Sequence, residues 1–81
     1  MPDPNEIRKA ARDAVARMTG KQVRDDEPLI SSGLIDSLSI LKLIGHLETS
    51  LSVTIPPDNL QPDDFETVQE ICQTVERVTQ P

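Results

Sequence analysis

Apolar residues recur at every third or fourth position in three stretches of the chain, which is the spacing of one face of an α-helix. The first stretch predicts a helix over about Pro4–Thr19, since a proline suits the first helical position and Gly20 suits the end. The second predicts a helix that begins after Asp36 as its N-cap and continues to about Leu51. The third predicts a helix over about Thr67–Val78. The apolar positions that define these faces are Ile7, Ala10, Ala11, Ala14, Val15 and Met18, then Ile40, Leu43, Ile44, Leu47 and Leu51, and then Val68, Ile71, Cys72, Val75 and Val78.

Three segments connect these helices. Lys21–Asp36 is a long loop, and loops of this length in small domains are commonly functional or held by their own side chains. Val53–Pro57 must be extended because β-branched residues precede two prolines, and Pro62–Phe65 predicts a short helical turn. The side chains expected to hold the long loop are Leu29, Ile30 and Leu34. We therefore predict an all-α fold, a small four-helix bundle with three main helices and one short helix, as one domain over residues 1–81.

Composition narrows the possible partners. The chain has one Phe and no Tyr or Trp, so its core is aliphatic and it lacks the aromatic side chains that stack on nucleic-acid bases. Its net charge of -6 is uneven: Met1–Arg24 carries six basic and three acidic side chains, whereas Asp25–Pro81 carries two basic and eleven acidic ones. This acidic body disfavours nucleic acid and anionic membranes and favours basic patches on partner proteins, with solubility alone as the simpler explanation.

The remaining composition predicts a cytoplasmic protein. Cys72 is the only cysteine, so neither an intramolecular disulfide nor a cysteine zinc site can form. No apolar run approaches the roughly 20 residues of a membrane span, and the polar start of the chain lacks the apolar centre of a signal peptide. We expect a monomer with no membrane partner.

Asp36, Ser37 and Leu38 stand at the expected start of the second helix, and they allow two interpretations. An aspartate before an apolar-periodic run is an ordinary helix cap. A serine displayed at the electropositive end of a helix is also a suitable place to attach a phosphate. On the same helix Leu38, Leu41 and Gly45 fall outside the core-facing sector, and this second stripe has no evident use within the bundle.

The chain carries little that suggests catalysis. His46 is the only histidine, and nine residues of helix place it roughly 13 Å from Ser37 along the axis and on the opposite side, so it cannot act as the base for that serine. There is no Gly-x-Ser-x-Gly turn, phosphate-binding glycine loop or calcium-binding loop. Cys72 lies on the apolar face of the last helix and is expected to be a core residue. We predict no catalytic residue and no resident metal.

Three sequence segments together are informative: Gly33–Leu38, Val53–Pro56 and Phe65–Val68. With the order of helix, long loop, capped helix, extended segment and two more helices, they resemble the acyl carrier and peptidyl carrier protein family across nearly the whole chain. The resemblance is to stand-alone carriers, and it implies the same four-helix fold. It also implies a carrier of cargo rather than an enzyme.

The resemblance assigns Ser37 as the residue that receives a 4'-phosphopantetheine arm from coenzyme A, through a separate phosphopantetheinyl transferase. Acyl or aminoacyl cargo then rides on the arm as a thioester, loaded by a ligase or acyltransferase and passed to a downstream acyl-accepting enzyme. Asp36 is expected to support Ser37 by holding the magnesium used in the transfer as well as by capping the helix, with capping alone as the alternative. The residues expected to dock partners lie on the outer face of the second helix and are Leu38, Leu41, Lys42, Gly45 and Glu48.

The chain departs from fatty-acid carriers, whose second helix is crowded with acidic residues. Here Glu48 is the main acid on that helix, which favours a specialised pathway served by an adenylating ligase, including D-alanyl and other aminoacyl carriers, over primary fatty-acid synthesis. The other acids that remain available to a basic partner include Asp58, Asp63, Asp64 and Glu66. The competing hypothesis is an acidic helical interaction domain in which Ser37 is never modified and the leucine stripe binds another protein.

Overall fold

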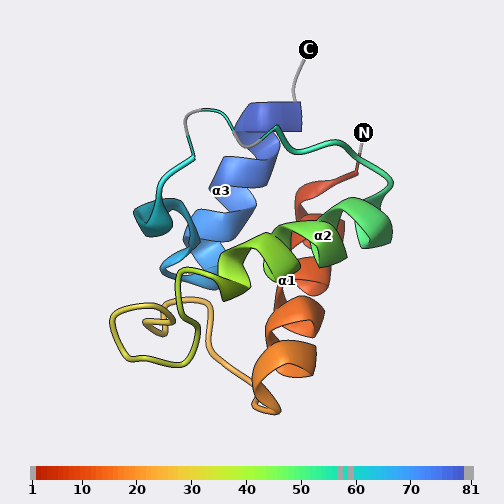
Figure 1. The fold of residues 1–81 in the computed structure, drawn as a ribbon. Helices are drawn as coiled ribbons and strands as arrows, with labels where there is room; N and C mark the ends of the chain where they lie inside the picture. The colour runs from red at the N-terminus through yellow and green to blue at the C-terminus, as the bar shows by residue number, and fades with distance from the viewer. Residues whose placement is uncertain (1, 57, 59, 80–81) are drawn as a thin grey trace.

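The computed structural model describes residues 2–56, 58 and 60–79, and all regular secondary structure in these residues is helical, without a strand. It contains α1 (Pro4–Thr19), α2 (Ser39–Leu51), the 3-10 helix η1 (Pro62–Phe65) and α3 (Val68–Thr79). α1 contacts both α2 and α3, and η1 contacts α3, so the elements form one small bundle (Figure 1). The predicted all-α architecture of three main helices and one short helix is confirmed.

α1 has the predicted bounds because both of its ends are chemically defined. The Asp3 carboxylate accepts a hydrogen bond of 2.9 Å from the Glu6 N–H, and Pro4 occupies the first helical position. Gly20 adopts φ 74°, a left-handed conformation that is costly for other residues, and its N–H closes the last turn on the Ala16 carbonyl at 2.8 Å. Sequence reasoning succeeds here because the ending signals are local.

The predicted start of α2 is wrong by two residues. Regular α-helix begins at Ser39, and Ser37 and Leu38 form a turn ahead of it. The Ser39 N–H donates to both the carbonyl oxygen (3.1 Å) and the carboxylate (2.8 Å) of Asp36, three residues earlier. This tight closure is a 3-10 type turn, which accounts for the delayed start. Asp36 therefore caps this turn, and Ser37 precedes the helix.

α3 is shifted by one residue at each end from its predicted range and covers Val68–Thr79. Thr67 acts as a cap instead of a helical residue: its hydroxyl oxygen accepts from the Glu70 N–H at 3.1 Å. The segment predicted to be extended has no regular secondary structure as far as Pro56, and Pro57 lies outside the described residues.

The core follows the predicted helix faces. Every predicted face position is buried except Met18, Leu51 and Val78, which are half-buried at the edge of the core. The largest fully buried side chains are Phe65, Ile7, Leu29, Leu43, Leu47, Ile71, Val15, Val68 and Val75. The single aromatic residue thus lies at the centre of an otherwise aliphatic core, where it joins η1 to the bundle.

The long loop between α1 and α2, at the lower left of Figure 1, is held in three ways. Leu29 is buried as predicted, while Ile30 and Leu34 only pack against the edge of the core. Ile35, which was not predicted to hold the loop, is 2 % exposed. At the start of the loop Asp25 forms ion pairs with two arginines of α1, Arg8 at 3.2 Å and Arg12 at 2.6 Å. The loop is therefore an ordered part of the fold.

Candidate functional site

Ser37 is exposed at the end of this loop, in a turn that is held by hydrogen bonds of the residues on both sides of it. On the N-terminal side, Ile35 is buried and its N–H donates to the Leu29 carbonyl at 2.9 Å. On the C-terminal side, the Asp36 carboxylate accepts from the Ser39 N–H at 2.8 Å. A serine held in this way presents its hydroxyl to a partner without first ordering its own backbone.

The electrostatics of the turn come from Asp36 and the start of α2. The hydrogen bond from the Ser39 backbone N–H lowers the pKa of the Asp36 carboxyl below its ordinary value, so this group is an anion at neutral pH. The first N–H groups of α2 supply a partial positive charge at the same place. Ser37 therefore lies between a fixed carboxylate and a helix end that favours anions.

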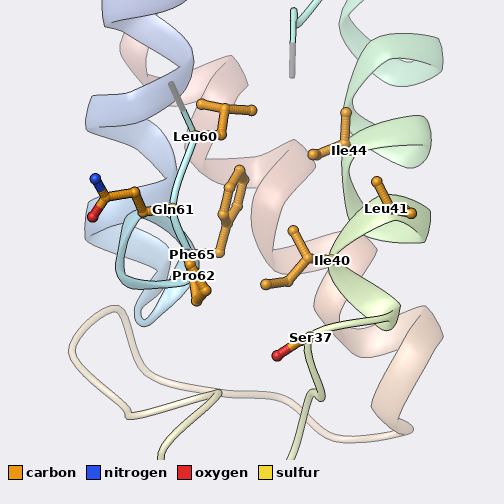
Figure 2. Close-up of a pocket in the computed structure, with 8 residues that line it drawn as sticks. All are labelled: Ser37, Ile40, Leu41, Ile44, Leu60, Gln61, Pro62 and Phe65. Carbon is orange, nitrogen blue, oxygen red and sulfur yellow. The ribbon is translucent and has the colours of Figure 1, made fainter. Parts of the chain in front are cut away.

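An apolar cleft of about 170 Å³ lies beside Ser37, between α2 and η1 (Figure 2). Ile40, Leu41 and Ile44 of α2 form one side of the cleft. The other side and the floor are formed by Leu60, Gln61, Pro62 and Phe65. Figure 2 shows Ser37 at one end of the cleft with its hydroxyl directed toward the η1 side. A group attached to this oxygen would have an apolar surface next to it.

The side chains beneath the cleft are buried. The residues whose packing would decide whether a long acyl chain enters the interior are all buried, at 0 to 3 % exposure: Val15, Leu43, Leu47, Ile55 and Val68. The exposed serine, the anion-favouring helix end and the shallow apolar cleft fit a phosphodiester-linked arm with a flexible body. The space available to that arm is on the surface of the bundle.

The outer stripe of α2 is open to solvent. Leu38 and Leu41 are 81 % and 68 % exposed, so the loop between α1 and α2 does not cover them. Lys42 and Gly45 are also exposed, and a side chain added at Gly45 would meet nothing within 4 Å. A helical glycine is destabilising by roughly 0.5–1 kcal/mol relative to alanine, and the fold gives no reason for it here.

Glu48, also expected to dock partners, has a structural contact instead of a free carboxylate. It is half-buried, and its Oε2 accepts from the Ile55 N–H at 2.8 Å, which ties the extended segment to α2. Sequence spacing placed Glu48 on the helix but could not reveal this contact, because Ile55 follows the end of the helix. The acidic character available on this face is smaller than the sequence suggests.

The remaining candidate groups lie apart from Ser37. His46 is half-buried, and it is not among the residues that line the cleft. Cys72 is 6 % exposed, and its burial raises the pKa of the thiol, as expected for a core residue. In residues 2–56, 58 and 60–79 no group of three or more His, Cys, Asp or Glu side chains is arranged to hold a metal ion. No helix of the described chain is long and apolar enough to cross a membrane.

Glu66 was expected only to be one of several acids available to a basic partner, but the structure gives its carboxylate contacts within the fold. Its carboxylate is turned inward, onto the loop that leads to Ser37, and accepts backbone hydrogen bonds from Leu29, Ile30 and Ser31. The sequence did indicate that such contacts must exist, because the backbone N–H groups of a long loop without regular structure need acceptors from elsewhere in the fold. Nothing in the spacing of the two segments identifies which acid supplies them.

Comparison with known proteins agrees with a site suited to a phosphodiester-linked arm. A family model described as "Phosphopantetheine attachment site" matches residues 9–75. The chain is 38 % identical over 53 residues to the D-alanyl carrier proteins of Streptococcus pyogenes serotype M5 (strain Manfredo) and serotype M1. Each alignment covers 65 % of this chain and 67 % of the relative.

Proposed function

The chain belongs to the phosphopantetheine attachment family, and from this premise we propose that Ser37 is the residue that bears the arm. Proteins of this family are carriers with covalently attached 4'-phosphopantetheine, so the chain is a phosphopantetheine carrier. The observation that carries the assignment is the exposed Ser37 hydroxyl beside the apolar cleft. Two neighbouring serines are less suitable because their hydroxyls already donate hydrogen bonds within the fold, Ser31 to Glu66 at 3.2 Å and Ser32 to the Pro28 carbonyl at 2.7 Å.

Attachment forms a bond between the Ser37 oxygen and the phosphorus that bears the pantetheine. The pyrophosphate bond of coenzyme A breaks, the nucleotide leaves with the bridging oxygen, and the serine proton passes to a base of the transferase. The resulting phosphodiester is an anion near the start of α2, where the free N–H groups stabilise it. Asp36 contributes an ionised carboxylate next to this reaction, and we propose that it helps to hold the magnesium of the transferase complex in addition to capping the turn.

The cargo is an aminoacyl or short acyl group in a specialised pathway. The relatives with 38 % identity are named D-alanyl carrier proteins, which supports an aminoacyl cargo. The described core side chains are packed at low exposure, which favours a cargo held outside the bundle over a long acyl chain within it. The outer face of α2 agrees with this assignment, because Leu38, Leu41 and Lys42 present an apolar surface with one cation instead of an acidic surface.

Partner enzymes therefore dock on the outer face of α2. These are the phosphopantetheinyl transferase, a loading ligase or acyltransferase, and an enzyme that accepts the thioester. Leu38 and Leu41 serve as apolar anchors, and the glycine at position 45 lets a partner approach the helix closely. Glu48 acts at the edge of this surface, with one of its oxygens already bonded to Ile55.

The decisive experiment is an intact-mass measurement. The purified chain is incubated with coenzyme A, magnesium and a broad-specificity phosphopantetheinyl transferase, beside the Ser37→Ala variant and the control variant Ser32→Ala. Wild type and Ser32→Ala should each gain the mass of one phosphopantetheine group, and Ser37→Ala should gain none. An unmodified wild type would support the competing interaction-domain hypothesis, and a Ser37→Ala variant that still gains mass would place the arm elsewhere.

The cargo assignment has its own test. The arm-bearing protein is offered D-alanine and, separately, a long-chain fatty acid, each with ATP and an adenylating ligase specific for that substrate. Thioester formation with D-alanine and not with the fatty acid is the expected result. The reverse preference would indicate a carrier of fatty acyl groups and would leave Ser37 as the attachment residue.

A further inference from the structure

One carboxylate oxygen of Glu66 accepts several backbone hydrogen bonds from the loop that precedes Ser37. Its Oε1 accepts hydrogen bonds from the N–H groups of three consecutive residues, Leu29 at 3.0 Å, Ile30 at 2.9 Å and Ser31 at 3.0 Å. The Ser31 hydroxyl donates to the same oxygen at 3.2 Å. Consecutive N–H groups turned toward one anion form a nest, and bonds of this kind are about twice as strong as neutral ones. Glu66 therefore holds three consecutive residues of the loop through one shared acceptor.

The position of Glu66 joins two parts of the Ser37 site. It directly follows Phe65, which with Pro62 lines the η1 side of the cleft beside Ser37. On the loop side, the Leu29 N–H also donates to the Glu66 carbonyl at 2.7 Å, and the Leu29 carbonyl accepts from the Ile35 N–H at 2.9 Å. Ile35 is two residues before the serine. A continuous series of hydrogen bonds thus connects the far side of the cleft with the turn that displays Ser37.

We propose that Glu66 is a positioning residue for the modification of Ser37: it fastens the loop in the one arrangement that the transferase recognises. The inference rests on the proposed role of Ser37 as the attachment residue. The loop contains no regular helix or strand, so its backbone groups depend on acceptors elsewhere in the fold. Without the anion, three neighbouring N–H groups lose their shared acceptor, and the turn that carries Ser37 is free to sample other conformations.

The pKa of Glu66 agrees with this role. The hydrogen bond from the Ser31 backbone N–H lowers the pKa of the carboxyl below its ordinary value of 4.5, so the anion persists throughout the neutral range. The fastened state of the loop is therefore the state that a transferase meets under ordinary conditions.

Loosening the loop has a specific kinetic consequence. If only a fraction of the molecules holds the competent arrangement, the apparent affinity of the transferase falls by that fraction, while the chemistry in the bound complex is unchanged. Replacing the carboxylate by a neutral amide of the same shape, Glu66→Gln, exchanges charge-assisted hydrogen bonds for neutral ones. We expect KM for the carrier to rise by roughly tenfold with little change in kcat.

The test measures transfer kinetics and amide hydrogen exchange on the same proteins. Wild type, Glu66→Gln and the control Glu70→Gln are compared at a temperature at which each is fully folded. Glu70 is a suitable control because its half-buried carboxylate also accepts a hydrogen bond, from the Thr67 hydroxyl at 3.2 Å, but within the start of α3. In Glu66→Gln the amides of Leu29, Ile30 and Ser31 should exchange faster, with α1 and α3 unchanged and KM raised. In Glu70→Gln the loop amides and KM should match wild type.

Each other outcome counts against the proposal. An unchanged KM in Glu66→Gln, with or without faster exchange of the loop amides, overturns it and leaves Ser37 as the attachment residue. An equal rise of KM in Glu70→Gln also overturns it, because the effect would then follow from general stability. Wild-type protein that gains no arm overturns the proposed function itself, and this inference with it. If Glu66→Gln does not fold, Ser31→Ala, which removes one donor and leaves the carboxylate, takes its place with an expected rise in KM of about two- to threefold.

Discussion

The two faces of α2 should respond to substitution in opposite ways, and Leu41 and Leu43 provide a matched pair. Both are leucines of one helix, two residues apart, but Leu43 is fully buried and Leu41 is 68 % exposed. The proposed variants are Leu43→Ala and Leu41→Ala. Each truncates the same side chain, so differences between them arise from the surroundings of each leucine.

The expected magnitudes follow from burial. A fully buried leucine replaced by alanine reduces the free energy of unfolding by about 2–5 kcal/mol, through lost burial and the cavity left behind. A domain of 81 residues has a total stability of roughly 4–12 kcal/mol, so Leu43→Ala removes a large share of it and lowers Tm by about 10–30 °C. Leu41→Ala loses little burial and keeps a good helix former, so Tm should change by only a few degrees at most.

Transfer kinetics should show the reverse order. An exposed leucine that becomes an interface anchor contributes more than about 1 kcal/mol to binding, so Leu41→Ala should lower kcat/KM for the phosphopantetheinyl transferase by about five- to tenfold. Leu43→Ala, assayed well below its own Tm, should be modified at nearly the wild-type rate. Thermal unfolding by circular dichroism and intact-mass kinetics provide both numbers. Leu41 is not a docking anchor if Leu41→Ala is modified as fast as wild type, and it is not a surface residue if Leu41→Ala unfolds at a temperature as low as Leu43→Ala does.

Three further results are expected. Asp36→Asn should retain the cap with at most a small loss of Tm but lower the rate of arm transfer, because an amide can cap the turn and binds magnesium less well than a carboxylate; an unchanged rate would leave Asp36 with capping alone. Gly45→Ala should raise the free energy of unfolding by up to about 1 kcal/mol, measured by urea denaturation, since nothing lies within 4 Å of the added methyl group. Cys72 should react slowly with an alkylating reagent in the native protein, because burial raises its thiol pKa, whereas attachment of the arm should add one rapidly reacting thiol.

Acid should destabilise the fold in a defined window. The carboxyls of Asp36 and Glu66 both have a lowered pKa because backbone N–H groups, of Ser39 and Ser31 respectively, bond to the anions. A group with a lowered pKa in the folded state contributes stability that is complete above its ordinary value, here 3.8 for Asp36 and 4.5 for Glu66, and that is lost as the pH falls through the folded value. Urea midpoints should therefore stay level from neutral pH to about the upper of these values and then decline. Glu66→Gln should decline less steeply, and an equal decline would contradict the contribution of Glu66.

Local signals made much of the fold predictable from the sequence. Pro4 and Gly20 define the ends of α1 through backbone chemistry that depends on no distant residue. The face of α2 could be read from spacing because Ile40, Leu43 and Leu47 repeat with the helical period and all turn toward the core. The start of α2 was harder, because Asp36 can close either a 3-10 turn or an α-turn and spacing alone does not distinguish them.

Some features of the site could likewise be predicted from the sequence, and others could not. The motif around Ser37 was visible in the sequence, and so was the stripe that contains Leu38 and Leu41, because both depend on the order of residues within one segment. The contact of Glu66 with Leu29 was not visible, since it joins residues 37 positions apart in two segments without a shared period. The bond from Ile55 to Glu48 was missed for the same reason, as it crosses the end of a helix. Contacts of a side chain with the backbone of another segment leave no periodic trace in a sequence.

These hidden contacts explain how so small a domain can display a serine in an ordered turn. A loop that connects two helices usually gains order from buried side chains, and here only Leu29 and Ile35 are fully available for that purpose. The backbone itself still needs acceptors, and two acids outside the loop provide them: Glu66 for the loop and Glu48 for the extended segment that follows α2. The segments that precede and follow α2 are thus each held by a carboxylate that accepts backbone hydrogen bonds. The acidic residues serve the fold at these two positions, and the surface around Ser37 presents the Asp36 carboxylate, two exposed leucines and a single lysine for partners to recognise.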